Sequence, residues 1–463
     1  MSTVPERDDI LPLMPSQAWF LKGHQYDLLN PNRWNLRRVI FLPDGCSEKL
    51  ARSAVEFVWR AHDALRVTFC RSGNDWAQRI SGDSDNPPFR VVDVSRVEAD
   101  RQPDAVGRIE EQLHNTLNIE TGPLVRFMYV HGGVGSPPRL IIAVHHLVCD
   151  LHSMDLIVSD IDHFLDCAQL GREPRLPRSL PYGEAVLALA DYARSATLRA
   201  ELDYWLSRPW ADVVDLPRDR PDYSGEPFRQ LTSLYVKSGP RDTRAVTSRE
   251  GIQPVHVVLG VVADAITAWA NGPVCVEMLW HGRQVTRGSD GPPVLSPRVW
   301  RTVGWFATSG LAVIPPRGSL DPDTYLENLS ESLESVPNQG IGPALLRGMA
   351  LRSHDVDAAN RMFARRTFQF GYFSSANQRR MNLLKVVRPS GGAVPLEGDV
   401  LEPRLPMNVR ARIRPDALKF WLEYDSGIHF ESTVAKVAES ILGTLSDYAE
   451  FVDVPTDDVM DPA

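Results

Sequence analysis

The sequence predicts an α/β fold on two observations. Short apolar runs rich in β-branched residues, such as 140–144, alternate with amphipathic helical segments along the chain. The same rhythm recurs on both sides of a proline-rich stretch at 174–181, although no sequence repeat accompanies it. Because 463 residues are too many for one hydrophobic core, we predict two α/β domains of similar architecture, residues 1–178 and 179–463.

Apolar periodicity places the individual elements. In the first half, the predicted strands are 35–42, 66–69, 124–130 and 140–144, and the predicted helices begin near Ser16, Ser47, Ala105 and Ser153. In the second half, the predicted strands are 232–236, 274–279, 367–373 and 418–424, and the predicted helices are 184–205, 255–270, 325–333 and 432–451. Residues 302–315 are expected to form two strands separated by a glycine kink, and 336–347 a shaped loop.

The composition is that of a soluble globular protein, with 43% apolar and 24% charged residues. No segment approaches the roughly 20 apolar residues that span a bilayer, and the N-terminus lacks signal-peptide features, so we predict a cytoplasmic protein with no membrane partner. A formal charge of −9 argues against a nucleic-acid partner, which would need a basic surface. The five cysteines form no C-x-x-C pair, which predicts free thiols and neither disulfides nor a zinc site.

A polar loop between the run 140–144 and the following helix holds His145, His146 and Asp150. An imidazole titrates near neutral pH and can accept a proton from an attacking amine or alcohol. Adjacent strand residues point to opposite faces, so only one of the two histidines is expected to face a cleft. A buried Asp150 would need a cationic partner.

Other catalytic classes find no support in the sequence. No further His or Cys group lies at the spacing of metal ligands, so a metal site is not expected. The chain has no G-x-S-x-G, P-loop or G-x-G-x-x-G motif, which would indicate a serine hydrolase, a nucleotide hydrolase or a dinucleotide enzyme. The His-His loop is therefore the best candidate for chemistry.

The segment H-H-L-V-C-D at 145–150 resembles the H-H-x-x-x-D-G signature of the condensation-domain superfamily of nonribosomal peptide synthetases, which is related to chloramphenicol acetyltransferase. Further stretches resemble the family's other motifs in the same order along nearly the whole chain. They are P-L-M-P-S-Q at 12–17, R-A-H-D-A-L-R-V-T-F at 60–69, L-P-R-D-R-P at 216–221, V-G-W-F at 303–306 and P-N-Q-G-I-G at 337–342. The ordered set is more specific than any single motif.

The resemblance implies two chloramphenicol acetyltransferase-like subdomains in a V-shaped pseudo-dimer, with a tunnel at their interface. The phosphopantetheine arm of a peptidyl or acyl carrier protein would bring an acyl thioester from one side, and a small-molecule amine or alcohol would enter from the other. By match to the motif, His146 is the catalytic residue, as general base or as the group that positions the nucleophile. His145 and Asp150 would shape the loop, and Arg66 is the expected ion-pair partner of Asp150.

Two departures from the family's motifs bear on function. Leu151 replaces the glycine after the aspartate, and His152 follows it, so the loop loses a permissive residue and gains bulk. With Trp305 of V-G-W-F, these side chains are expected to line the substrate channel. The related epimerization domains share features with 303–306 but use a glutamate in E-G-H-G-R; here that motif is L-W-H-G-R at 279–283, so epimerase activity is not expected.

These observations predict a free-standing condensation enzyme of natural-product biosynthesis. It would join a carrier-bound acyl or aminoacyl group to an amine or alcohol as an amide or ester, with no metal or redox cofactor of its own. Two alternatives stay open. One is a non-catalytic condensation-like module that binds carrier proteins or recruits a tailoring enzyme, and the other is an acyl-CoA-dependent acyltransferase of the same superfamily.

Overall fold

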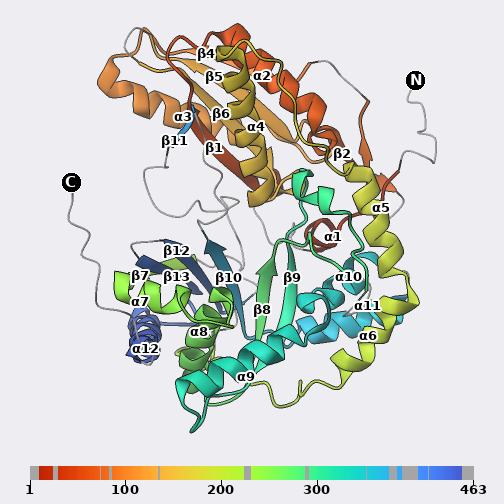
Figure 1. Cartoon of the computed structure of the whole chain (residues 1–463), viewed down its shortest axis with the longest axis vertical. Helices are drawn as coiled ribbons and strands as arrows, with labels where there is room; N and C mark the ends of the chain where they lie inside the picture. Colours follow the sequence, from red (N-terminus) through yellow and green to blue (C-terminus); the bar gives the residue numbers. More distant parts are fainter. Residues whose placement is uncertain are drawn as a thin grey trace.

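The computed structural model describes residues 10–23, 30–72, 75–82, 86–133, 136–223, 231–286, 291–350, 352–374, 383–387, 405–414 and 417–450. These residues form two large β-sheets, each packed against helices, and a small two-stranded sheet. This architecture agrees with the predicted α/β class. Figure 1 shows the two large sheets in separate parts of the molecule, one above the other. Within the described ranges, no helix has the length and apolar character needed to cross a bilayer.

The upper part in Figure 1 is built on a five-stranded sheet with the strand order β11-β1-β6-β5-β4. The strands are β1 (Asn35–Phe41), β4 (Phe89–Asp93), β5 (Val125–His131), β6 (Arg139–His145) and β11 (Lys385–Val387). The central strand β6 runs antiparallel to both β1 and β5, and its last residue, His145, lies opposite Asn35. The sheet thus positions the start of the His-His loop.

Burial on both faces explains the apolar run of β6. The helices α2 (Glu48–Ala61) and α4 (Leu151–Gln169) cover one face of the sheet, and α3 (Gln102–His114) covers the other. Leu140 and Ile142 pack on the α2 and α4 side, whereas Ile141 and Ala143 pack on the α3 side. Because alternate strand residues point to opposite faces, a strand covered on both sides has no position for a polar residue.

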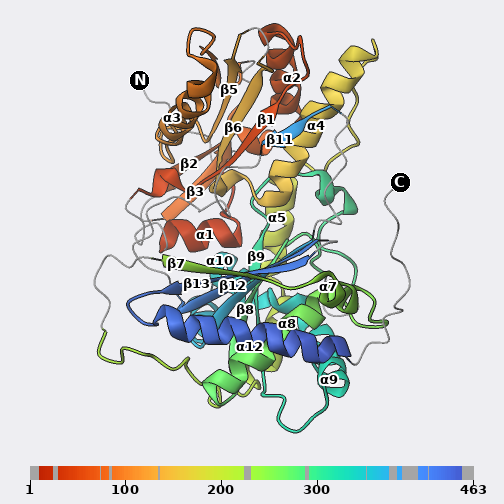
Figure 2. The same ribbon diagram turned by 90° about the vertical axis from the view of Figure 1, so that its left-hand side faces the viewer.

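The lower part contains a six-stranded sheet with the order β7-β13-β12-β10-β8-β9. Its strands are β7 (Leu231–Lys237), β8 (Val274–Trp280), β9 (Thr308–Ile314), β10 (Phe368–Ser374), β12 (Met407–Arg414) and β13 (Ala417–Asp425). Strand β10 is parallel to β8 and β12, and the remaining pairs are antiparallel. The helices at its lower side in Figure 2 are α7 (Pro240–Thr247), α8 (Pro254–Ala270), α9 (Pro322–Glu334) and α12 (Glu431–Glu450).

Several segments connect the two parts. The helices α5 (Tyr182–Ala193) and α6 (Ala196–Leu206) run down one side of the molecule (Figure 1). Helix α1 (Pro15–Lys22) is first in the sequence but packs against α10 (Gly342–Met349), which also contacts α11 (Ser353–Phe363). Strand β11, drawn in blue, pairs with β1 in the upper sheet. The two halves of the chain are therefore interleaved, and the division at residue 178 stays a prediction.

The predicted helix at 184–205 and the predicted loop at 336–347 differ from the structure. The single helix expected at 184–205 is two helices, because the Ser195 side chain caps α6 by accepting a hydrogen bond from the Leu198 N–H at 3.1 Å. The loop expected at 336–347 is a 3₁₀ turn, Pro337–Gly340, followed by α10. At Ser195 the apolar periodicity continues although the hydroxyl cap begins a new helix. Periodicity alone therefore predicted a single helix that is too long.

Candidate active site

The His-His loop connects β6 to α4 through a short 3₁₀ turn, His146–Val148. The His146 N–H donates to the Trp34 carbonyl at 2.8 Å, and the Asp150 N–H donates to the Gly304 carbonyl at 3.2 Å. Asp150 is the N-cap of α4, where its carboxylate accepts a hydrogen bond from the Ser153 N–H at 2.8 Å. The helix therefore begins at Leu151, two residues earlier than the sequence predicted.

His145 is fully buried, and contacts account for both of its ring nitrogens. The Leu147 N–H donates to Nδ1 at 3.1 Å, which leaves the proton on Nε2 to donate to the Pro31 carbonyl at 3.0 Å. Burial lowers the pKa of His145 to about 3. A neutral imidazole with both nitrogens engaged holds the end of β6 against the segment around Pro31.

His146 has a different environment. Its half-buried ring packs on Trp305 with a centroid distance of 4.5 Å, and Trp34 lies 6.3 Å away on a second side. The Nδ1 atom is buried and has no hydrogen-bond partner in the described part of the chain. Burial lowers the pKa of His146 to about 4, so the ring is neutral at pH 7 and can accept a proton.

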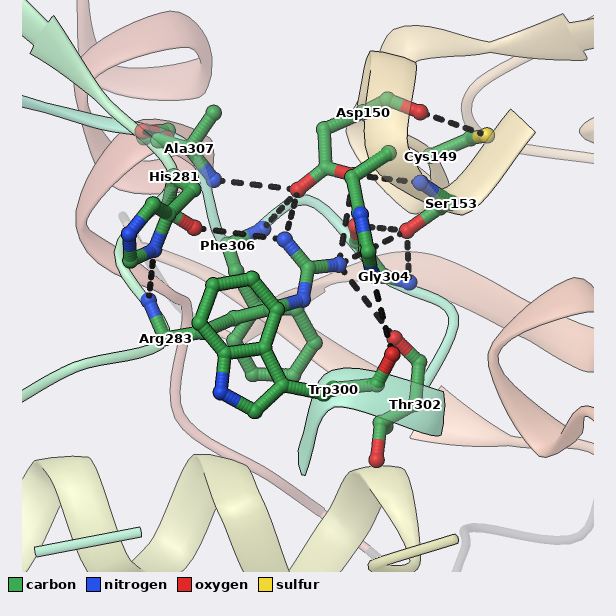
Figure 3. A network of polar contacts seen from close by, with 12 residues as sticks. Cys149, Asp150, Ser153, His281, Arg283, Trp300, Thr302, Gly304, Phe306 and Ala307 are labelled. Atoms are coloured by element: carbon green, nitrogen blue, oxygen red, sulfur yellow. Dashed lines mark hydrogen bonds and ion pairs between the residues drawn. The ribbon is translucent and has the colours of Figure 1, made fainter. Parts of the chain in front are cut away.

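Asp150 lies at the centre of a buried polar network (Figure 3). The two terminal guanidinium nitrogens of Arg283 donate to its carboxylate, Nη1 to Oδ2 at 2.8 Å and Nη2 to Oδ1 at 3.2 Å. The N–H groups of Phe306 and Ala307 donate to Oδ2 at 3.1 and 3.2 Å. Burial alone would raise the pKa of Asp150, but the Arg283 charge and these hydrogen bonds lower it to about 2. The ionised carboxylate thus joins the loop to two segments of the second half.

The predicted pairing of Asp150 with Arg66 is wrong, because the partner is Arg283. Arg283 is fully buried, and its Nη2 also donates to the Ser153 hydroxyl at 3.0 Å. The Nη1 of Arg66 instead donates to the Trp59 carbonyl at 2.7 Å. Arg283 lies 133 residues from Asp150 in the chain, so proximity in sequence could not identify it. The available signal was its place in the L-W-H-G-R motif.

The same network explains why 302–307 is not a strand. The Gly304 carbonyl accepts from the Ser153 hydroxyl at 2.8 Å, and the Gly304 N–H donates to that hydroxyl at 3.0 Å. The Phe306 N–H donates to Asp150 at 3.1 Å. These backbone groups are therefore bonded to the loop and the first turn of α4, and only β9, from Thr308 onward, pairs with a strand.

The residues expected to line a substrate channel occupy three positions around this loop. Leu151 is the first residue of α4 and is 39% exposed. The Nε2 of His152 is 2.9 Å from the Trp300 carbonyl, and burial lowers the pKa of His152. Trp305 is buried against His146. Of the three, Trp305 contacts the candidate base, and the contact of all three with substrate stays a prediction.

Since Leu151 is a helical N1 residue, its backbone does not need the left-handed conformation that glycine permits. Among the described non-glycine residues, positive φ angles occur at Asn271 and Asn338. The loss of glycine after the aspartate is therefore accommodated without backbone strain. What changes at this position is the size of an exposed side chain.

A second buried cluster lies ten residues further along α4, and the sequence did not predict it. Nη2 of Arg301 is 2.7 Å from each carboxylate oxygen of Asp160. Nε2 of His62, which follows α2, is 2.9 Å from Oδ2 of the same carboxylate. All three residues are less than 10% exposed. The cluster ties α2 and α4 to the segment that leads to Trp305.

Two side chains of β8 bear on the epimerization alternative. Leu279 is 39% exposed and carries no titratable group. Glu277, on the same face of the strand, is buried and pairs with Arg366 at 2.6 Å. A carboxylate held by an arginine is poorly suited to exchange a proton with a substrate.

No group of three or more histidine, cysteine or carboxylate side chains among the described residues is arranged to hold a metal ion. Four of the five cysteines, namely Cys46, Cys149, Cys167 and Cys275, are buried, Cys70 is partly buried, and all five are free thiols. Burial raises the pKa of the Cys149 thiol well above its ordinary value, and the adjacent carboxylate of Asp150 raises it further. The imidazole of His146 is thus the group in the loop best suited to move a proton.

A model of the condensation domain family matches residues 7–460. The chain belongs to the condensation domain family. It is 28% identical over 456 residues to one of the linear gramicidin synthase proteins of Brevibacillus parabrevis, a match that covers 96% of this chain and 9% of that protein. It is 23% identical over 448 residues to tyrocidine synthase 1 from the same organism, covering 93% of this chain and 39% of that protein. The chain therefore spans well under half the length of these curated relatives.

Solved structures with the same fold include both condensation and epimerization domains. The epimerization domain from the third module of tyrocidine synthetase B has a TM-score of 0.80 at 22% identity, covering 96% of this chain and 97% of that one. A structure of condensation domain-mediated chain release from the enacyloxin polyketide synthase has a TM-score of 0.69 at 16% identity, covering 100% of this chain and 86% of that one. The predicted family and its chloramphenicol acetyltransferase-like fold are confirmed.

Proposed function

We propose that this condensation domain transfers an acyl or aminoacyl group from the phosphopantetheine thioester of a carrier protein to an amine or alcohol acceptor. The observation that carries the proposal is His146, a neutral, half-buried imidazole in the family's His-His loop. Membership of a family that forms amide bonds on phosphopantetheine-bound substrates supports this reaction class. The donor, the acceptor and the choice between amide and ester belong to the proposal.

The chemistry assigned to His146 is a proton transfer. The acceptor nitrogen or oxygen attacks the thioester carbonyl, and an unprotonated ring nitrogen of His146 takes the proton that the acceptor loses. The carbon–sulfur bond then breaks, and the phosphopantetheine thiolate leaves and recovers a proton. General-base assistance of this kind contributes typically about 10²–10⁴ in rate. The reaction needs no cofactor on this chain, because the partner carries the phosphopantetheine.

Asp150 and Arg283 are proposed to position the base. Asp150 caps the start of α4, and Arg283 holds its carboxylate in an ion pair. The same carboxylate accepts a hydrogen bond from the Phe306 N–H. Trp305, the preceding residue, packs on the His146 ring. Removal of either charge would therefore loosen the wall behind His146 without removing the imidazole itself.

Epimerization is the weaker candidate, although an epimerization domain shares the fold. That reaction needs a second acid–base group opposite the histidine. At the corresponding position this chain has Leu279, and the nearby Glu277 is paired with Arg366. These two observations favour acyl transfer.

The decisive experiment follows the mass of a carrier protein loaded through phosphopantetheine with an aminoacyl or aryl group. The loaded carrier is incubated with panels of amines and alcohols and with the wild type, His146→Ala or His354→Ala. His354 is a matched control because its side chain is 81% exposed. We expect acceptor-dependent unloading by the wild type and His354→Ala, and at least about 10²-fold slower unloading by His146→Ala.

Two other outcomes identify the alternatives. If the carrier binds but no acceptor is acylated by the wild type, the chain is a non-catalytic module and the proposal fails. If free acyl-CoA replaces the loaded carrier with equal efficiency, the chain is an acyl-CoA-dependent acyltransferase. Inversion of the aminoacyl stereocentre without unloading would instead establish epimerization.

A further inference from the structure

A cavity of about 170 Å³ lies beside the end of β8, between the sheet and the helices α8 and α9. Its apolar walls are formed by Met278, Leu311, Ala312, Leu333 and Val336, and Gln253, His256 and Glu334 contribute a comparable polar surface. Trp280 of the L-W-H-G-R motif forms a further wall. Trp280 and Met278 share one face of β8, because alternate residues of a strand point the same way. Neither residue has a part in the proposed acyl transfer.

Polar groups occur at defined points of this cavity. The indole Nε1 of Trp280 is buried and has no hydrogen-bond acceptor among the residues that the structure describes. His256 is buried, and its Nδ1 lies 2.9 Å from the hydroxyl of Ser330. That hydroxyl lies 3.4 Å from Oε1 of Glu334, which stands exposed at the rim. Glu334 is the acidic side chain among the residues that line the cavity.

The charge of the lining is negative. Burial lowers the pKa of His256, which keeps its imidazole neutral at pH 7, and no Lys or Arg lines the cavity. Glu334 is the last residue of α9, so the partial negative charge of the helix C-terminus adds to its carboxylate. The contact described for its carboxylate is the one with the Ser330 hydroxyl. The site therefore favours a cation at its rim.

The N-terminus of α8, which also borders the cavity, does little to attract an anion. Its first residue is Pro254, which has no N–H. The N–H groups of His256 and Val257 already donate to the carbonyl of Gln253, at 2.8 and 3.2 Å. Few free donors are left at this helix end, so the carboxylate of Glu334 determines the sign of the charge.

We infer that this cavity binds a small ammonium compound with an apolar body, its cation at Glu334 and its body between Met278, Trp280 and Leu333. A cavity of about 150 Å³ lined by apolar side chains takes up benzene, so the present volume suits an aryl or branched alkyl amine. The indole of Trp280 adds a face on which a cation is attracted. His146 is not among the residues that line the cavity, and the inference does not depend on the proposed acyl transfer.

The test uses the full chain and three ligands of equal shape but different charge, namely benzylamine, benzyl alcohol and benzoate. Binding is measured by ligand-observed NMR and by calorimetry for the wild type, Glu334→Gln and Glu331→Gln. Glu331 is a matched control, since it is an exposed glutamate of the same helix that does not line the cavity. Ala312→Leu, which fills the cavity, is the fourth protein.

We expect benzylamine to bind more tightly than benzyl alcohol, and benzoate to bind least. Glu334→Gln should weaken benzylamine about fivefold, as for a partly exposed ion pair, and should leave benzyl alcohol unchanged. Glu331→Gln should bind like the wild type, and Ala312→Leu should lose both ligands while keeping its thermal unfolding transition. The inference fails if no ligand binds, if benzyl alcohol equals benzylamine, or if Glu334→Gln and Glu331→Gln behave alike.

Discussion

Helix α4 carries two buried aspartate–arginine pairs whose surroundings differ. Asp150, at its N-cap, accepts hydrogen bonds from Arg283 and from three backbone N–H groups, those of Ser153, Phe306 and Ala307. Asp160 lies ten residues later, about 15 Å along the helix, and the contacts described for it come from the side chains of His62 and Arg301.

The difference lies in what each carboxylate holds in place. Backbone donors can meet Asp150 only if the segments that carry them follow a particular path, so this pair determines the course of the loop behind His146. Asp160 joins side chains, which can adjust their rotamers with less effect on the main chain. We therefore infer that the first pair governs the site and the second mainly governs stability.

The largest expected effect is that of Arg283→Ala. It leaves Asp150 buried without its cation, which typically costs about 3–5 kcal/mol of stability. It should also slow acyl transfer strongly, because the Phe306 backbone and with it Trp305 lose their anchor. Urea unfolding and carrier-unloading rates measure the two effects. Arg66→Ala should cost clearly less on both scales; if the two variants behave alike, the assignment of Arg283 as the partner is wrong.

Asp160→Asn should give the second largest loss of stability, about 3 kcal/mol, because Arg301 keeps a buried charge without its carboxylate. Acyl transfer at a temperature where the variant is folded should change by less than about tenfold. The double variant Asp160→Asn/Arg301→Met removes both charges and should recover part of the stability. If Asp160→Asn is fully folded but transfers the acyl group much more slowly than the wild type, the Asp160 pair governs the site as well as stability, and the inference is wrong.

The pH dependence of stability provides a third test. The pKa of His146 is about 4 in the folded protein and about 6.5 when unfolded, so the unfolded chain binds more protons between these values. Stability is then fully present above pH 6.5 and decreases as the pH falls toward 4, by about 2 kcal/mol for a half-buried ring. His146→Gln should show a shallower decrease in urea titrations from pH 7 to 4.5. An unchanged slope would mean that the ring is solvated.

Leu151→Gly, which restores the family's residue, should have the smallest effect. Glycine at the first helical position costs at most about 1 kcal/mol, because it lowers helix propensity. If the exposed leucine narrows access for acceptors, the variant should lower KM for bulky acceptors and leave kcat within about threefold. Thermal unfolding and transfer assays with small and bulky acceptors measure this. Equal KM changes for both acceptor sizes would exclude a steric role.

Local pattern was sufficient to predict the fold class, the strand β6 and the motif loop. The apolar run at 140–144 requires burial on both faces, and the resemblance to the H-H-x-x-x-D motif makes His146 the candidate base before any contact is known. The sequence also contains the local signal for the helix break, the capping residue Ser195, but the continuous apolar periodicity favoured a single helix. These features depend on residues that are close together in the chain.

The tertiary structure decided which distant residues complete the site. Arg283 reaches Asp150 across 133 residues, Arg301 reaches Asp160 across 141, and β11 joins a sheet whose other strands end before residue 146. A buried carboxylate requires a cation, but the sequence alone does not show which of the many arginines supplies it. Only the packing of the two sheets determines which guanidinium comes within about 3 Å, the distance of a hydrogen bond, and that packing is a property of the whole chain.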